Sequence, residues 1–189
     1  SNDSVNQTLK RLIPLAEDIR PTSTNSSQIA TWQLVVQNQT AATLQVDPTL
    51  IPEDKDLELT TSVATFNLRL QPLVNLGLKE NQVTLILKPR IPEVSSLLQN
   101  YPNPFNPETW IPYGLSEDAQ VTIEIYNTTG EIVRRLVIGH KAAGLYYSTD
   151  RAAYWDGQNQ SGEQVASGVY FYRIIAGQYD QTRKMVILK

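Results

Sequence analysis

The residue best suited to acid–base or nucleophilic chemistry is the single histidine, His140. It lies in the segment 139–144, which we expect to be a loop between strands. A Ser–His–Asp site could use it, but the chain has no Gly-x-Ser-x-Gly sequence and no strand-to-helix turn to hold one. With one His and no Cys, the chain also lacks the usual ligands of zinc and the thiolates of iron–sulfur clusters. We therefore expect a surface histidine and no catalytic residue, so that the protein is not an enzyme.

Carboxylates gather in two stretches that could offer oxygen ligands to calcium. One is an acidic loop (Asp47, Glu53, Asp54, Asp56 and Glu58), and the other is a turn (Asp156, Asn159 and Glu163). Neither has the order of an EF-hand loop, so solvated loops or Asx turns are the alternative. No carboxylate is flanked by an aromatic cluster that would line a sugar cleft, because we expect the three tryptophans to be core or strand residues (Trp32, Trp110 and Trp155). Phosphate-binding motifs are absent. The sequence predicts no metal and no cofactor.

Asn-x-Ser/Thr sequons are more frequent than chance would give. Six are present, at Asn2, Asn6, Asn25, Asn38, Asn127 and Asn159. All lie in segments predicted to be an N-terminal arm or turns, where a glycan could be accommodated. The alternative is that β-turns are rich in Asn, Ser and Thr for conformational reasons. The candidate glycosylation sites are Asn6, Asn25, Asn38, Asn127 and Asn159.

Apolar residues alternate with polar ones along most of the chain, which indicates strands with one buried face. In the first half, three predicted strands each have one apolar face. The residues of these faces are Ala30, Trp32, Leu34 and Val36; Ala64, Phe66, Leu68 and Leu70; Val83, Leu85 and Leu87. In the second half the alternation is stronger, at Val121, Ile123 and Ile125, in a strand from 168 to 175, and in a terminal strand from 182 to 188. Short strands at this spacing predict an all-β fold of two immunoglobulin-like sandwiches.

Proline and glycine divide the chain into two regions. All 11 prolines lie between Pro14 and Pro112, and eight of the 9 glycines lie between Gly114 and Gly177. The sequence therefore predicts an N-terminal arm (1–28), a small β-sandwich (29–94) and a second β-sandwich (95–189). The formal charge of −3 and pI near 5.2 argue against a nucleic-acid partner, and no stretch is apolar for long enough to form a membrane helix.

A group of ordered motifs covers the second half. It comprises the segment 97–107 (LLQNYPNPFNP), the strand 121–126, the segment 130–134, Trp155-Asp156-Gly157, the strand 168–172, and the closing segment 184–189. Together they resemble the carboxy-terminal sorting domains of type IX secretion cargo proteins. The Trp-Asp-Gly segment is also similar to the immunoglobulin-like part of flagellar hook-capping proteins. We expect the proline run to be an extended, polyproline-like segment that anchors Phe105.

The resemblance implies a bacterial protein of the extracellular space or cell surface. Its C-terminal domain would serve export, surface attachment or assembly, with the secretion machinery or a surface component as partner. By the same resemblance, Gly177, Lys184 and Lys189 are the candidate recognition positions. An alternative is a self-assembling subunit of a filament or surface layer, a homo-polymer linked through the arm and open sheet edges, in which the sequons could carry glycans.

Overall fold

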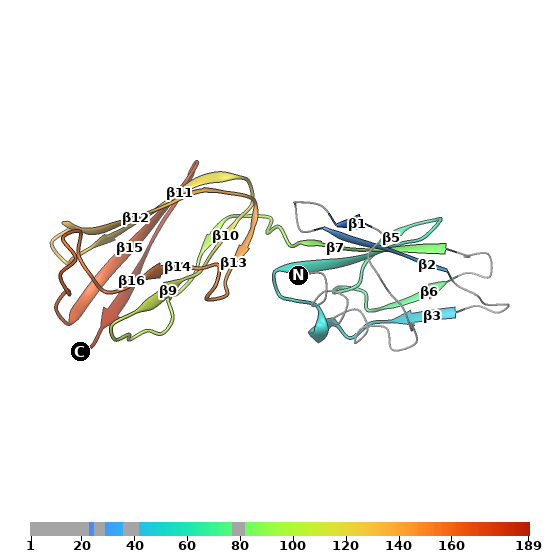
Figure 1. Ribbon diagram of the computed structural model, residues 1–189, viewed down its shortest axis with the longest axis horizontal. Helices are drawn as coiled ribbons and strands as arrows, with labels where there is room; N and C mark the ends of the chain where they lie inside the picture. The colour runs from blue at the N-terminus through green and yellow to red at the C-terminus, as the bar shows by residue number, and fades with distance from the viewer. Residues whose placement is uncertain (1–22, 25–28, 36–41, 77–81) are drawn as a thin grey trace. The chain divides into compact units, whose positions relative to one another are not determined.

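The computed structural model describes residues 23–24, 29–35, 42–76 and 82–189. The chain is all-β, as predicted, and the described residues contain one 3₁₀ turn, Pro48–Leu50. It divides into two compact units, Ser1–Arg90 and Ile91–Lys189 (Figure 1). The second unit therefore begins four residues before the expected position 95, and Pro92 lies beside Gly114 of that unit.

The first unit is a sandwich of a five-stranded and a two-stranded sheet. The larger sheet has the order β1-β2-β7-β4-β5 and the smaller pairs β3 with β6. The bounds are β1 Ser23–Thr24, β2 Ala30–Val35, β3 Ala42–Gln45, β4 Lys55–Thr60, β5 Thr65–Asn67, β6 Leu73–Leu76 and β7 Gln82–Pro89. Strand β1 comes from the segment expected to be the arm, and it pairs with the first residues of β2. Residues 1–22 and 25–28 of that segment lie outside the described part.

The predicted inward faces of β2 and β7 are correct for the residues that the structure describes, and Val36 lies outside them. Trp32 is fully buried, and Val83, Leu85 and Leu87 all belong to the core. The predicted strand from 64 to 70 is shorter than expected, because β5 ends at Asn67. There the Asn67 side chain accepts a hydrogen bond from the Arg69 backbone at 3.0 Å, and the resulting turn leaves Leu70 81% exposed. A local side-chain hydrogen bond has thus replaced the strand ladder.

The second unit has a four-stranded sheet with the order β12-β11-β15-β16, a three-stranded sheet β13-β10-β8 and a pair β14-β9 (Figure 1). The bounds are β8 Ser96–Leu97, β9 Thr109–Ile111, β10 Tyr113–Leu115, β11 Ala119–Tyr126, β12 Ile132–Lys141, β13 Gly144–Tyr146, β14 Ala153–Trp155, β15 Gly168–Ala176 and β16 Tyr179–Ile187. Val121, Ile123 and Ile125 are fully buried in its core, as their alternation predicts. His140 is exposed on β12, so the expectation that it lies in a loop is wrong.

The proline run does not form the extended segment that was expected. Residues 102–104 and 106–107 are bends, and the three X–Pro bonds ending at Pro102, Pro104 and Pro107 are cis. Phe105 is nevertheless anchored, since it is 2% exposed and packs against Trp155 with ring centroids 5.5 Å apart. Among the described residues, no helix has the length and apolar character needed to cross a membrane.

Candidate functional site

The three positions implied by the resemblance are spread along β16. Gly177 lies in the turn between β15 and β16, with a φ of 59° that favours glycine. Lys184 is exposed near the far end of β16, and Lys189 follows that end, where its backbone N–H donates to Ser167 Oγ at 3.0 Å. Strand β16, which rises about 3.3 Å per residue, lies between Gly177 and Lys189, so these two residues are at its opposite ends. The structure therefore does not bring the three together, and Lys184 is the one that lies on a sheet face.

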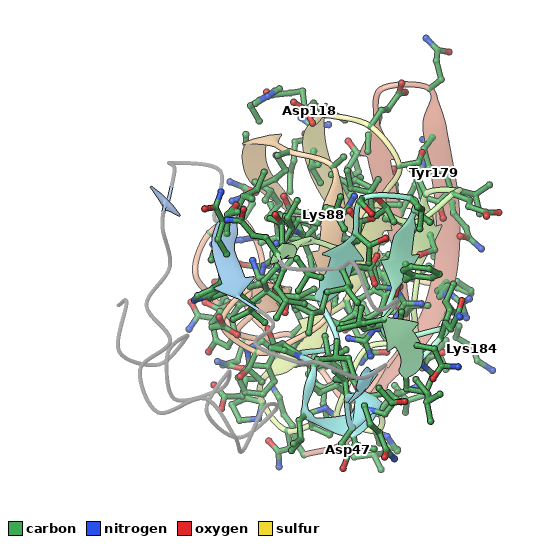
Figure 2. The ribbon with its side chains drawn as sticks, turned by 90° about the vertical axis from the view of Figure 1, so that its right-hand side faces the viewer. Asp47, Lys88, Asp118, Tyr179 and Lys184 are labelled. Atoms are coloured by element: carbon green, nitrogen blue, oxygen red, sulfur yellow. The ribbon has the colours of Figure 1, made fainter. Side chains whose placement is uncertain are left out.

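That face, which we call the outer face, is the solvent side of the sheet β12-β11-β15-β16. Alternate residues of each strand point into the core, so their neighbours form the outer face. In the strand register, Lys184 lies opposite Phe171, and Phe171 lies opposite Tyr126. Figure 2 shows Lys184 and Tyr179 on the same strand, with the Lys184 side chain pointing away from the ribbon.

A network of charged side chains crosses the outer face. Arg135 donates to Glu124 Oε1 through Nε at 3.0 Å and Nη2 at 2.7 Å. The Tyr126 hydroxyl donates to Glu124 Oε2, and Arg173 donates to both carboxylate oxygens of Asp180. The hydrogen bond from Tyr126, followed by those from Arg135, lowers the pKa of Glu124 despite its burial. Glu124 is therefore a buried carboxylate held ionised by its neighbours.

Apolar side chains flank this network and are partly exposed. On β15, Phe171 is 36% and Val169 is 38% exposed. Just beyond β16, Leu188 is 55% exposed, and at the start of β12, Ile132 is 48% exposed. Exposed apolar side chains gathered on one sheet face are typical of surfaces that bind another molecule. The outer face thus offers a cation, Lys184, directly beside an aromatic ring, Phe171.

The edge of the sheet at β16 is covered. Gln99 donates to the Lys184 carbonyl at 3.0 Å, and Val186 N–H donates to the Asn103 side chain at 2.9 Å. Arg183 donates to the Leu97 carbonyl at 2.6 Å. Because these backbone groups are already paired, an incoming strand cannot add at this part of the edge. Binding at Lys184 has to use the outer face.

Two of the candidate glycosylation sites lie in nearly identical five-residue loops. Asn127 accepts from the Thr129 and Glu131 N–H groups at 3.0 and 2.9 Å, and donates to Glu131 Oε2 at 2.7 Å. Asn159 accepts from the Ser161 and Glu163 N–H groups at 2.9 Å each, and donates to Glu163 Oε2 at 2.9 Å. Both asparagines close Asx turns. The sites Asn6, Asn25 and Asn38 lie outside the described residues, and glycosylation stays a prediction.

The expected acidic loop is a loop only in part, because Asp56 and Glu58 lie on β4, and its carboxylates are used locally. Asp47 caps the 3₁₀ turn by accepting from Thr49, Asp56 lies 3.6 Å from Arg69 Nε, and Glu58 lies 2.8 Å from Lys88 Nζ. Asp47 and Lys88 are labelled in Figure 2. In the ranges that the structure describes, no three His, Cys, Asp or Glu side chains are grouped as metal ligands.

Residues 108–179 match the FlgD Ig-like domain. The match confirms the resemblance to the hook-capping Ig-like domain and lies within the second unit. The comparison with curated proteins gives no match.

Solved structures with a similar arrangement include two proteins of Porphyromonas gingivalis. Dimeric latent PorU is 15% identical, with a TM-score of 0.38 over 92% of this chain and 20% of that chain. PorZ, described as an essential bacterial surface component of the type IX secretion system, is 16% identical, with a TM-score of 0.36 over 56% of this chain and 14% of that chain. A β-glucuronidase of an uncultured Clostridium species is 9% identical, with a TM-score of 0.26 over 86% and 35%. The chain thus spans a fifth or less of PorU and PorZ, and the likeness concerns the fold alone.

Sequence reasoning missed two features of the second unit. The charge network was missed because its members come from four strands whose register no local pattern reveals. The second is an aromatic pair beside a carboxylate: Tyr154 donates to Glu108 Oε2 at 2.7 Å and packs against Trp110. The sequence signal for this aromatic pair is the position of Trp110 between Thr109 and Ile111. Both neighbours are buried, so the Trp110 ring lies on the opposite side of the strand.

Proposed function

We propose that this chain is a non-enzymatic bacterial protein of the cell surface or extracellular space, whose C-terminal Ig-like unit serves export, surface attachment or assembly. The observation that carries the proposal is the position of Lys184. It is exposed on the outer face beside Phe171, while the adjacent sheet edge is covered by residues 97–105. A partner with a carboxylate or phosphate group and a small apolar surface fits this combination.

The test is export of the full chain. The chain, preceded by a Sec signal peptide and an epitope tag, is expressed in P. gingivalis and in a strain without a working type IX system. We expect the protein in the surface or medium fraction of the first strain and inside the cells of the second. Equal export by both strains would contradict the secretion part of the proposal.

A pair of variants tests the site. Lys184→Gln removes the Lys184 charge from the outer face, whereas Lys141→Gln removes a cation from β12 in the same unit. We expect a several-fold loss of exported protein for Lys184→Gln and none for Lys141→Gln. Equal export of both variants would remove Lys184 from the proposal. The intact mass of the exported protein then distinguishes a retained C-terminal unit from one that is removed after export.

Self-assembly is a second candidate, favoured by the apolar side chains along β12. Val137 is 71% and Ile132 48% exposed, and β12 is an edge strand of the four-stranded sheet. If copies associate through this strand, Val137→Lys lowers the mass measured by light scattering, because a charge on an edge strand opposes pairing. Deleting residues 1–22, which leaves β1 in place, tests the rest of the arm separately, and an unchanged mass for both variants contradicts self-assembly through these elements.

A further inference from the structure

Three aromatic residues form a row on the second unit, which we call the aromatic strip: Tyr101, Trp110 and Tyr154. Trp110 of β9 lies opposite Tyr154 of β14, and it forms an antiparallel bridge with Tyr101 on its other side. Ring centroids are 6.2 Å apart between Tyr101 and Trp110, and 5.7 Å apart between Trp110 and Tyr154. The chain neighbours of Trp110 and Tyr154 are buried, so these two rings are on the solvent side of the β14-β9 pair.

The aromatic strip is accessible to solvent, and in this Trp110 differs from the other two tryptophans of the chain. Tyr154 is 48% exposed, and Tyr101 and Trp110 are partly exposed. Trp32 and Trp155 are 0% exposed. Trp110 is therefore the tryptophan whose ring a binding partner can reach. Its fluorescence reports on the strip.

Carboxylates border the strip. Glu108 accepts the hydrogen bond of the Tyr154 hydroxyl at 2.7 Å. That hydrogen bond raises the pKa of Tyr154, and the charges of Glu108 and Asp156 raise it further. At the other end, burial and the charge of Asp150 raise the pKa of Tyr101. The nearby cation, Arg151, is placed over the ring of Tyr146 at 4.8 Å from its centroid.

We propose that the aromatic strip binds an extended, basic segment of a protein partner, with arginine or lysine side chains at alternate positions placed over the rings. Aromatic faces attract cations, most strongly over Trp and within about 6 Å of the ring centroid. The carboxylates of Glu108, Asp150 and Asp156 give the surface a charge complementary to such a segment. Arg151 over Tyr146 is an example of the same interaction within the unit.

The spacing of the rings selects an extended segment. Side chains at alternate positions of an extended chain lie on one face, about 6.6–6.8 Å apart. The ring centroids are 6.2 and 5.7 Å apart, so successive cations reach successive rings. The strip differs from the outer face in its residues and its charge, and the inference does not rest on the export proposal.

The test is a fluorescence titration of the full chain with the peptide acetyl-Gly-Arg-Gly-Arg-Gly-Arg-Gly-amide. The control peptide carries citrulline, which is nearly the same shape as arginine but uncharged. We expect the arginine peptide to change the tryptophan emission and to bind about threefold to fivefold more tightly than the citrulline peptide for each ring engaged. We also expect the affinity to fall as salt is raised from 50 to 300 mM, because exposed charges are screened.

Glu108→Gln and Glu93→Gln form a matched pair of variants. Both residues are exposed glutamates of the second unit, but only Glu108 borders the strip. Glu108→Gln should lower the affinity for the arginine peptide several-fold, and Glu93→Gln should not change this affinity. The proposal is overturned by equal binding of the two peptides, by equal effects of the two variants, or by the absence of an emission change at millimolar peptide. Salt-independent binding of a neutral oligosaccharide such as cellohexaose, with no binding of the arginine peptide, would also overturn it and assign the strip to glycans.

Discussion

Phe105 and Ile187 form a parallel bridge that joins the start of the second unit to its final strand. The Phe105 N–H donates to the Val186 carbonyl at 3.1 Å, and the Leu188 N–H donates to the Phe105 carbonyl at 3.0 Å. The ring of Phe105 is buried against Trp155. One residue of a bent, proline-rich segment thus adds a strand-like contact to β16, close to the exposed Lys184.

The first prediction is that Phe105→Ala destabilises the second unit by about 3–5 kcal/mol, the range for deleting a buried phenylalanine ring. Denaturant unfolding followed by tryptophan fluorescence measures this, since Trp155, one of the three tryptophans, contacts the deleted ring. Phe171→Ala is the control, because Phe171 is an aromatic residue of the same unit but is 36% exposed. It should cost less than about 1.5 kcal/mol. Similar losses for the two variants would show that Phe105 does not anchor its segment.

The second prediction compares two glycines with similar backbones. Gly157 and Gly130 have φ angles of 71° and 83°. A methyl group on Gly157 would overlap the Pro107 carbonyl oxygen, whereas one on Gly130 meets nothing within 4 Å. Both alanine variants suffer the left-handed strain of about 1–2 kcal/mol. Gly157→Ala should lose at least about 2 kcal/mol more in unfolding free energy, since backbone has to move. An equal loss would mean that the Pro107 segment yields without cost.

The third prediction concerns pH. The folded-state pKa of Glu124 is lowered, first by Tyr126 and then by Arg135. A lowered carboxyl pKa contributes stability above the pKa of the unfolded chain, about 4.3, and that contribution is lost as the pH falls through the folded-state value. Glu124→Gln should therefore unfold more easily than the wild type at pH 7, by about 1–2 kcal/mol.

The measurement is the difference in unfolding free energy between the wild type and Glu124→Gln at several pH values. The difference should be constant from pH 7 to about pH 5 and should shrink below about pH 4.3. Other carboxyl groups are common to both proteins, so their titration cancels. A difference that is the same at pH 3 and pH 7 would show that the charge of Glu124 does not stabilise the fold.

Much of the fold follows from the sequence because alternation is a local property. Trp32 and Ile123 are buried where the period of two places them. The strand expected at 64–70 is shorter than predicted because Asn67 offers its own side chain to the backbone, and a turn residue can override alternation. The bends at residues 102–104 and 106–107 were missed because proline fixes its own φ and suits both extended segments and turns, so a proline run alone does not decide between them.

The candidate site could be predicted less well, because it depends on which strands are neighbours. Glu124 contacts Arg135 on one neighbouring strand, while Arg173 lies opposite it on the other. A register shift of one residue would place these side chains on opposite faces. The aromatic strip likewise joins residues 101, 110 and 154 through pairing over long sequence distances. Lys184 was found only through the motifs of the resemblance, since an exposed lysine on a strand has no signal of its own.

The last prediction separates the folding role of the Asn159 sequon from glycosylation. Asn159 closes its loop through its side-chain oxygen, so Asn159→Ala leaves the Ser161 and Glu163 N–H groups without that acceptor. We expect a loss of about 1–2 kcal/mol in unfolding free energy. Ser161→Ala also destroys the sequon but keeps the Asn159 oxygen and both backbone donors, so it should cost less than about 0.5 kcal/mol. If the sequon is used, both variants lower the intact mass of the native protein by the same glycan. Equal stability of the two variants in unglycosylated protein would contradict the structural role of Asn159 and leave glycosylation as the reason to have asparagine there.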